Sequence, residues 1–206
     1  MKELISIRQE IYNFFSSSKD CKKFFYNPDN EERLVAYYTS MYLIDDTAES
    51  LDWHREKGFS ENPLEAYIEF WGVMQAITIQ QDAICELYWA IEGKRLNWKK
   101  RDDLKAWRQI RKIRNICAGH PAKKDRPKHE SIKRTFLRRN FGSYLLIEYE
   151  QWKKPKTSRK PTDIFENISH PKVRLGEIID DYSKEAGDVL NKILQSMRAQ
   201  WSNTEE

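Results

Sequence analysis

The chain has 206 residues, of which 39% are hydrophobic and 33% are charged, and its formal net charge is +4. This is enough apolar material for one well-buried domain, and it argues against a chain that is disordered throughout. The apolar runs are short, and the first ten residues carry charges where a signal peptide would be apolar. We therefore expect one domain over residues 1–206, no membrane partner and a cytoplasmic location.

The first half of the chain predicts helices. Apolar residues at helical spacing predict a first helix over residues 4–15, which the serines at 16–18 interrupt. Two longer helices are predicted over 28–58 and 63–93, because each segment opens on an Asn-Pro pair and ends at a glycine. We expect these two long helices to be antiparallel neighbours.

Gln81 and Asp82 are unusual positions in the second of these long helices. Gln81 lies on the apolar stripe, at helical spacing from Ile77 and Ile84, so its side chain needs a buried partner. Asp82 lies one position round the helix. Two interpretations stay open: the pair makes a hydrogen bond or a salt bridge between helices, or it supports a functional site by orienting one of its residues.

A further helix is predicted to begin near Asp102 or Asp103 and to end at Gly119. The spacing places Arg114 on or beside the inward face, whereas Arg108 and Lys112 should point to water. An arginine near the inward face requires a negative partner. The candidate partners on the two long helices are Asp45, Asp46, Asp82 and Glu86.

Residues 121–160 are strongly basic. Thirteen of the 36 Lys and Arg residues, but only four of the 32 Asp and Glu residues, lie here, so the segment carries +9 and the rest of the chain −5. Such a segment is typical of contact with a phosphate backbone, although Lys-rich loops are often simply solvated. The candidate contact residues are Lys123, Lys124, Arg126, Arg138 and Arg139.

The C-terminal part predicts one strand and one helix. Alternating side chains over 144–150 predict a strand, alone or in a hairpin, and apolar residues at helical spacing over 176–201 predict a helix that packs back on the others. The fold class is therefore mainly α, with a basic loop and strand insertion over 121–171. The aromatic residues Trp53, Trp71, Trp89, Trp98 and Trp107 are expected to fill the core and interfaces.

The three cysteines, Cys21, Cys85 and Cys117, have no Cys-x-x-Cys spacing and no histidine partner that would suggest zinc. This pattern favours ordinary buried thiols in a reducing compartment over a zinc site. We expect no metal and no cofactor.

The stretch RKIRNICAGHP, residues 111–121, carries the most specific pattern in the chain. Arg114 is followed by the polar Asn115 and, after five intervening residues, by His120. The pattern resembles the Arg, four to six residues, His signature of the HEPN superfamily of helical ribonucleases and toxins. Its place at the end of a helix, after a long helix pair and before a basic segment, is similar to that family over roughly residues 28–122.

The resemblance implies a HEPN-like antiparallel bundle and a metal-independent endoribonuclease of toxin or defence type. His120 would take the proton of the ribose 2′-hydroxyl, because an imidazole titrates near neutral pH. Arg114 would stabilise charge on the phosphate, and Asn115 would orient the imidazole or contact the phosphate. The resemblance also implies a homodimer with a shared cleft, and it suggests a cognate antitoxin of nucleotidyltransferase type.

Three alternatives stay open. The same fold could serve as a non-catalytic RNA-binding or adaptor module, or as a helical interaction protein whose basic segment meets an acidic partner protein. In the third, Arg114 is only an ion-pair partner inside the bundle and His120 only caps the helix end.

Overall fold

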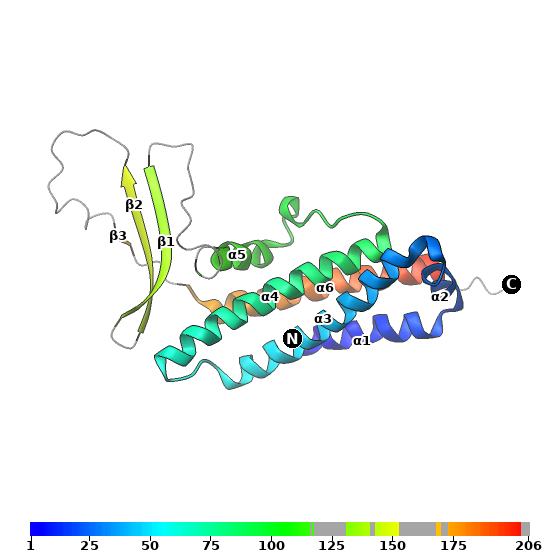
Figure 1. Cartoon of the computed structure of the whole chain (residues 1–206), viewed down its shortest axis with the longest axis horizontal. Helices are drawn as coiled ribbons and strands as arrows, with labels where there is room; N and C mark the ends of the chain where they lie inside the picture. The colour runs from blue at the N-terminus through cyan, green and yellow to red at the C-terminus, as the bar shows by residue number, and fades with distance from the viewer. Residues whose placement is uncertain (116, 118–130, 141–142, 153–167, 170–172, 203–206) are drawn as a thin grey trace.

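The structure, a computed structural model, describes residues 1–115, 117, 131–140, 143–152, 168–169 and 173–202, with side chains described for 1–115, 117 and 173–202. Within these ranges the protein is mainly helical, as predicted (Figure 1). Among the helices described, none combines the length and the apolar character that crossing a bilayer requires.

Four long helices lie side by side (Figure 1). They are α1 (Lys2–Ser17), α3 (Glu31–Lys57), α4 (Pro63–Glu92) and α6 (Leu175–Trp201). The shorter elements are α2 (Lys19–Phe25), α5 (Lys105–Arg114) and two 3-10 turns, η1 (Pro28–Asn30) and η2 (Trp98–Lys100). α3 runs antiparallel to both α1 and α4, and α6 runs parallel to α4. Because α1 contacts α3, α3 contacts α4, α4 contacts α6 and α6 contacts α1, the long helices form a closed ring of neighbours.

Local capping signals set the ends of the two longest N-terminal helices. Asn62 Oδ1 accepts the backbone N–H of Leu64 at 3.0 Å at the start of α4. Gly58 and Gly93 end α3 and α4 with φ of 78° and 70°, a left-handed region that favours glycine. The predicted start of α3 was three residues early, because Asn27 caps the separate turn η1 instead.

The break between α1 and α2 falls at Ser18, within the predicted serine interruption. Its hydroxyl accepts the backbone N–H of Cys21 at 3.2 Å and so caps α2. The same hydroxyl donates to the carbonyl of Trp201 at 3.0 Å, at the far end of α6. One side chain therefore shapes the N-terminal turn and joins it to the C-terminal helix.

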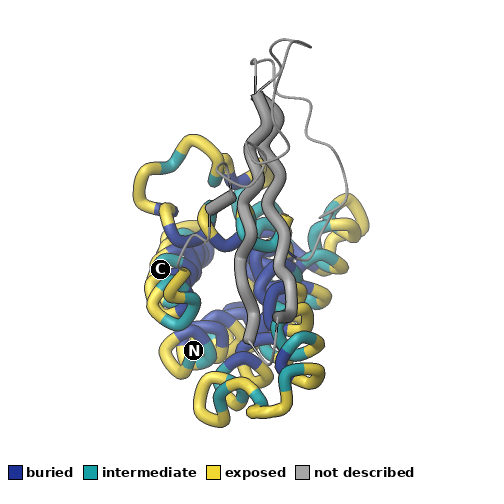
Figure 2. The backbone as a smooth tube through the Cα atoms, turned by 90° about the vertical axis from the view of Figure 1, so that its left-hand side faces the viewer, coloured by how far each residue is buried: buried dark blue, intermediate teal, exposed yellow. Residues whose placement is uncertain are grey.

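Apolar side chains from all the long helices fill the interior, where the buried faces of the helices meet (Figure 2). The largest fully buried side chains include Tyr37, Ile44, Met74, Ile84, Trp107 and Tyr182. Of the five tryptophans expected to fill the core and interfaces, Trp107 is fully buried, whereas Trp53 is 62% and Trp71 is 41% exposed and neither belongs to the core.

A buried polar cluster links α3, α4 and α6. Gln80 Nε2 donates to Thr47 Oγ1 at 3.1 Å, and Gln80 Oε1 accepts from the Tyr182 hydroxyl at 2.9 Å. Burial raises the pKa of Tyr182 well above its usual value, so the hydroxyl stays protonated and able to donate. Because both hydrogen bonds run between helices, the cluster fixes the register of three of them.

The described backbone between α5 and α6 forms strands. β1 (Ser131–Asn140) pairs antiparallel with β2 (Ser143–Trp152), so that Ser143 lies opposite Asn140. The two-residue β3 (Ile168–Ser169) pairs antiparallel with the other edge of β2. The strand order is β1-β2-β3.

Candidate functional site

Helix α5 lies along α4 and α6 (Figure 1), and α6 supplies the cap that its sequence lacks. The residue before α5 is Leu104, which has no side-chain acceptor. The Glu185 carboxylate accepts the backbone N–H groups of Ala106 and Trp107 at 2.9 and 2.8 Å. A negative charge at a helix N-terminus is also favoured by the helix dipole. This contact explains why α5 begins at Lys105, two to three residues later than predicted.

Gln81 joins α4 to the middle of α5. Its Nε2 donates to the carbonyl of Trp107 at 3.1 Å, and its Oε1 accepts Arg111 Nε at 2.8 Å. Arg111 also pairs with the Asp82 carboxylate and lies 5.0 Å from the centre of the Trp98 ring. Gln81 and Asp82 therefore both bind Arg111, and the hydrogen bond between helices that was one of the two interpretations is present.

Arg114 ends α5 in a different environment. Its Nη2 donates to Gln75 Oε1 at 3.1 Å, and its Nη1 donates to Asn115 Oδ1 at 3.2 Å. Its Nε is buried and has no hydrogen-bond partner among the described residues. Among the residues described, no carboxylate forms an ion pair with it. Among the described residues, the guanidinium is held by two neutral amides and meets no carboxylate.

The alternative in which Arg114 pairs with a carboxylate of the long helices does not hold within the described part of the chain. Asp82 pairs with Arg111, and Asp45 pairs with the buried Arg8 at 3.1 Å. The other two candidate carboxylates have no ion pair among the described side chains. The partner of Arg114 on α4 is Gln75, which is neutral.

Beyond Arg114 the backbone continues as a π-helical turn at Asn115 and Cys117. Asn115 is exposed, and Cys117 is buried. The remaining predicted residues cannot be placed next to this turn: His120, Lys123, Lys124 and Arg126 lie outside the described residues, and Arg138 and Arg139 lie on β1, whose backbone alone is described.

The other basic residues of α5 show what sequence reasoning missed. Lys112 is exposed, as predicted, but Arg108 is half-buried and donates to the carbonyls of Lys99 and Arg101. Arg111 was not singled out, although it binds two side chains of α4, Gln81 and Asp82. The spacing shows that Gln75 and Asp82, seven residues apart, share one face of α4, but it does not show which arginine of α5 each of them meets.

The thiols offer no nucleophile. Burial raises the pKa of Cys21 and Cys85 to about 12 and that of Cys117 to about 11. All three are free thiols and stay protonated at neutral pH. Within the described ranges, no group of three or more His, Cys, Asp or Glu side chains could hold a metal ion.

Comparisons with known proteins find no relative of this chain. No family model matches it, and neither the curated proteins nor the solved structures give a match. The proposals below rest on the residues of the chain and their contacts.

Proposed function

We propose that the protein is a metal-independent endoribonuclease with a HEPN-like helical bundle and a basic hairpin insertion over residues 121–171. The observation that carries the proposal is the environment of Arg114. A guanidinium stays protonated at any relevant pH and presents five donors. Its partners among the described residues, Gln75 and Asn115, accept hydrogen bonds without neutralising it, which leaves charge and further Nη donors for a phosphate group.

The proposed reaction uses the ribose as its own nucleophile. His120, whose role comes from the sequence motif, takes the proton of the 2′-hydroxyl, and the resulting oxygen attacks the adjacent phosphorus. The bond to the 5′-oxygen breaks, and that oxygen is protonated as it leaves. Arg114 stabilises the negative charge that develops on the non-bridging oxygens. The products carry a 2′,3′-cyclic phosphate and a 5′-hydroxyl.

Asn115 and the basic segment complete the proposed site. Asn115 is exposed beside Arg114 and can orient the imidazole or contact the phosphate. The basic segment 121–160 follows directly in the chain and would lie at the rim of the site. In the proposed assembly two subunits form a homodimer and their motifs share one cleft, and a nucleotidyltransferase-type antitoxin is the proposed regulatory partner.

The test is cleavage of a mixed-sequence RNA in EDTA by the wild type and His120→Ala, with end-group analysis of the products. We expect cyclic phosphate and 5′-hydroxyl ends from the wild type and no such products from the variant. Lys112→Ala is the matched control, because it removes an exposed charge from α5 two residues before Arg114. If His120→Ala cuts like the wild type, the catalytic assignment is wrong.

The segregated charge favours a second candidate, a non-catalytic RNA-binding module. Such a module would bind RNA in a strongly salt-dependent way through residues such as Lys123 and Lys124. Its affinity would fall in a Lys123→Ala/Lys124→Ala variant and would survive His120→Ala. RNA binding without cleavage by the wild type would favour this candidate over the ribonuclease.

A further inference from the structure

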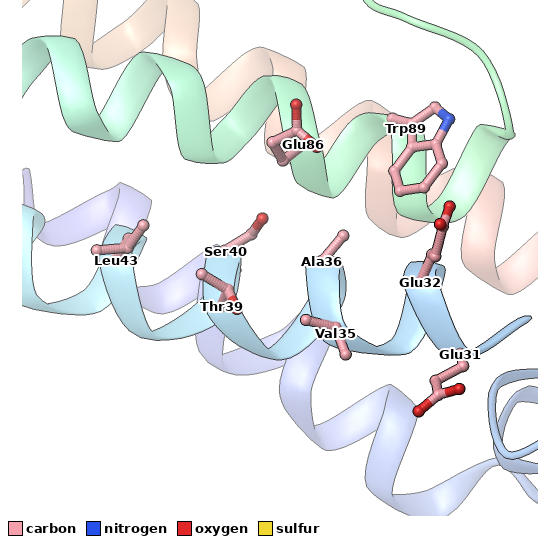
Figure 3. A pocket seen from close by; sticks show the side chains of 9 residues that line it. All are labelled: Glu31, Glu32, Val35, Ala36, Thr39, Ser40, Leu43, Glu86 and Trp89. Atoms are coloured by element: carbon pink, nitrogen blue, oxygen red, sulfur yellow. The ribbon is translucent and has the colours of Figure 1, made fainter.

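A groove of about 520 Å³ runs between α3 and α4 (Figure 3). Its lining residues are Glu31, Glu32, Val35, Ala36, Thr39, Ser40, Leu43, Glu86 and Trp89. From its first to its last residue on α3 it extends over thirteen residues, or about 18 Å, which is about three helical turns. This length suits a helix lying across the pair.

The floor of the groove is apolar and uncovered. Val35 and Leu43 lie eight residues apart on one face of α3 and are 59% and 37% exposed. The half-buried Trp89 lies opposite them on α4, and its ring faces the α3 side of the groove (Figure 3). The floor can therefore accept apolar side chains from a partner.

The rim is acidic and its charge is not neutralised. Glu31, Glu32 and Glu86 are exposed, and none forms an ion pair with any side chain described. The nearest cation on α3, Arg33, points elsewhere, because its guanidinium donates to the last carbonyls of α4 at 2.7 Å. The rim therefore carries three negative charges that a cationic partner can meet.

Two other tryptophans, Trp53 and Trp98, each have a basic side chain over the ring, and Trp89 has none among the described residues. Lys57 lies 5.0 Å from the ring of Trp53, and Arg111 lies 5.0 Å from the ring of Trp98. No described cation lies over Trp89. An aromatic face beside carboxylates binds an ammonium or guanidinium group well, so this ring is available to a cation from outside.

We propose that the α3–α4 groove binds a basic amphipathic helix of a partner protein. Apolar side chains on one face of that helix fill the floor around Val35, and its flanking Lys or Arg side chains pair with the rim carboxylates and cover Trp89. RNA is a polyanion and is excluded from this acidic face. Glu86 lies eleven residues, or about 16 Å along α4, from the Gln75 that binds Arg114, so RNA and the helix can bind together.

The experiment is a calorimetric titration of the full-length protein with a synthetic amphipathic helix of Leu, Ala and Lys, and with the same peptide carrying Glu for Lys. We expect the Lys peptide to bind more weakly as salt rises and the Glu peptide not to bind. Glu32→Gln/Glu86→Gln should weaken the affinity about tenfold. Val35→Lys should weaken it further, by placing a like charge on an exposed floor position.

The matched control is Glu49→Gln/Asp188→Asn, which removes two exposed carboxylates outside the groove. It should bind the Lys peptide like the wild type. Equal loss in the control pair, or binding of neither peptide, would overturn the proposal. Sedimentation of the same samples tests whether a second copy fills the groove: self-association of the wild type that Glu32→Gln/Glu86→Gln abolishes would also overturn it. None of these readouts depends on RNA cleavage.

Discussion

The middle of α4 and the end of α5 both place polar side chains against the bundle, but their hydrogen bonding differs. Gln80 and Gln81 are fully buried, and the oxygen and nitrogen of each side chain all have partners. Arg114 donates from its two Nη groups to neutral amides only, and among the described residues its charge has no counter-ion. Since buried polar groups are normally satisfied, the first region is complete as a structure, whereas the charge in the second is free to meet an anionic ligand.

The largest effect on stability should come from removing the hydrogen bonds of the buried Gln80. Gln80→Leu leaves the Tyr182 hydroxyl buried without an acceptor, and we expect it to lower the free energy of unfolding by about 3 kcal/mol. Urea denaturation measures the change. In a Gln80→Leu/Tyr182→Phe variant the unpaired hydroxyl is gone, so the double variant should lose less than the sum of the two single changes. Simple additivity would contradict the account of the cluster.

Arg111→Ala should have a smaller structural effect. It removes a donor from the buried oxygen of Gln81, which costs about 2 kcal/mol. The ion pair with the exposed Asp82 adds no more than about 1 kcal/mol. Urea denaturation with Lys112→Ala as control measures the difference. Unchanged stability in Arg111→Ala would show that Gln81 does not depend on this arginine.

His54 tests whether an unpaired buried group is enough to mark a functional site. It packs edge-on against Phe59 in the turn after α3, and its Nε2 has no hydrogen bond and lies 3.8 Å from Glu69. Burial lowers the pKa of His54, helped by Lys57 and opposed by Glu69. We interpret this histidine as structural.

The lowered pKa sets the sign of a pH effect. As pH falls from 7 through the usual histidine pKa of about 6.5, the unfolded chain binds a proton at His54 before the folded chain does. The free energy of unfolding should therefore fall between pH 7 and pH 5. His54→Gln should show a smaller fall in denaturation curves at the two pH values. An equal fall in both proteins would remove His54 as the cause.

The smallest effect on stability should come from substituting Arg114 at the end of α5. Arg114→Ala removes two hydrogen bonds to exposed amides and a buried Nε that has no partner, so we expect a change within about 0.5 kcal/mol. The measurement is urea denaturation beside Arg111→Ala. A loss as large as that of Arg111→Ala would make Arg114 a structural residue like its neighbour.

Local signals predicted the helices well, because they are carried by adjacent residues. Helix α4 starts after Asn62 and ends before Gly93, as expected. The C-terminal helix begins within one residue of the predicted start. The start of α5 was missed because its cap, Glu185, lies 79 residues beyond Ala106 in the chain. A helix boundary that depends on a side chain far away in the chain cannot be predicted from the neighbouring residues.

The candidate site was predictable in kind but not in its contacts. Helical spacing placed Arg114 beside the inward face, where it is half-buried. Spacing could not show that Arg111 pairs with Asp82 and that Arg114 binds Gln75, because these pairings depend on the position of α5 along α4. The groove at Trp89 was missed for the same reason, since it exists only where two helices meet.

The most direct test of the central claim is the rate at which Arg114→Ala cleaves a mixed-sequence RNA in EDTA, compared with Lys112→Ala. The account predicts that Arg114→Ala folds normally and cleaves about a hundred- to a thousandfold more slowly, the usual loss when one transition-state donor is removed. Lys112→Ala should cleave like the wild type. Cleavage by folded Arg114→Ala at the rate of the control would contradict the claim that Arg114 acts on the phosphate.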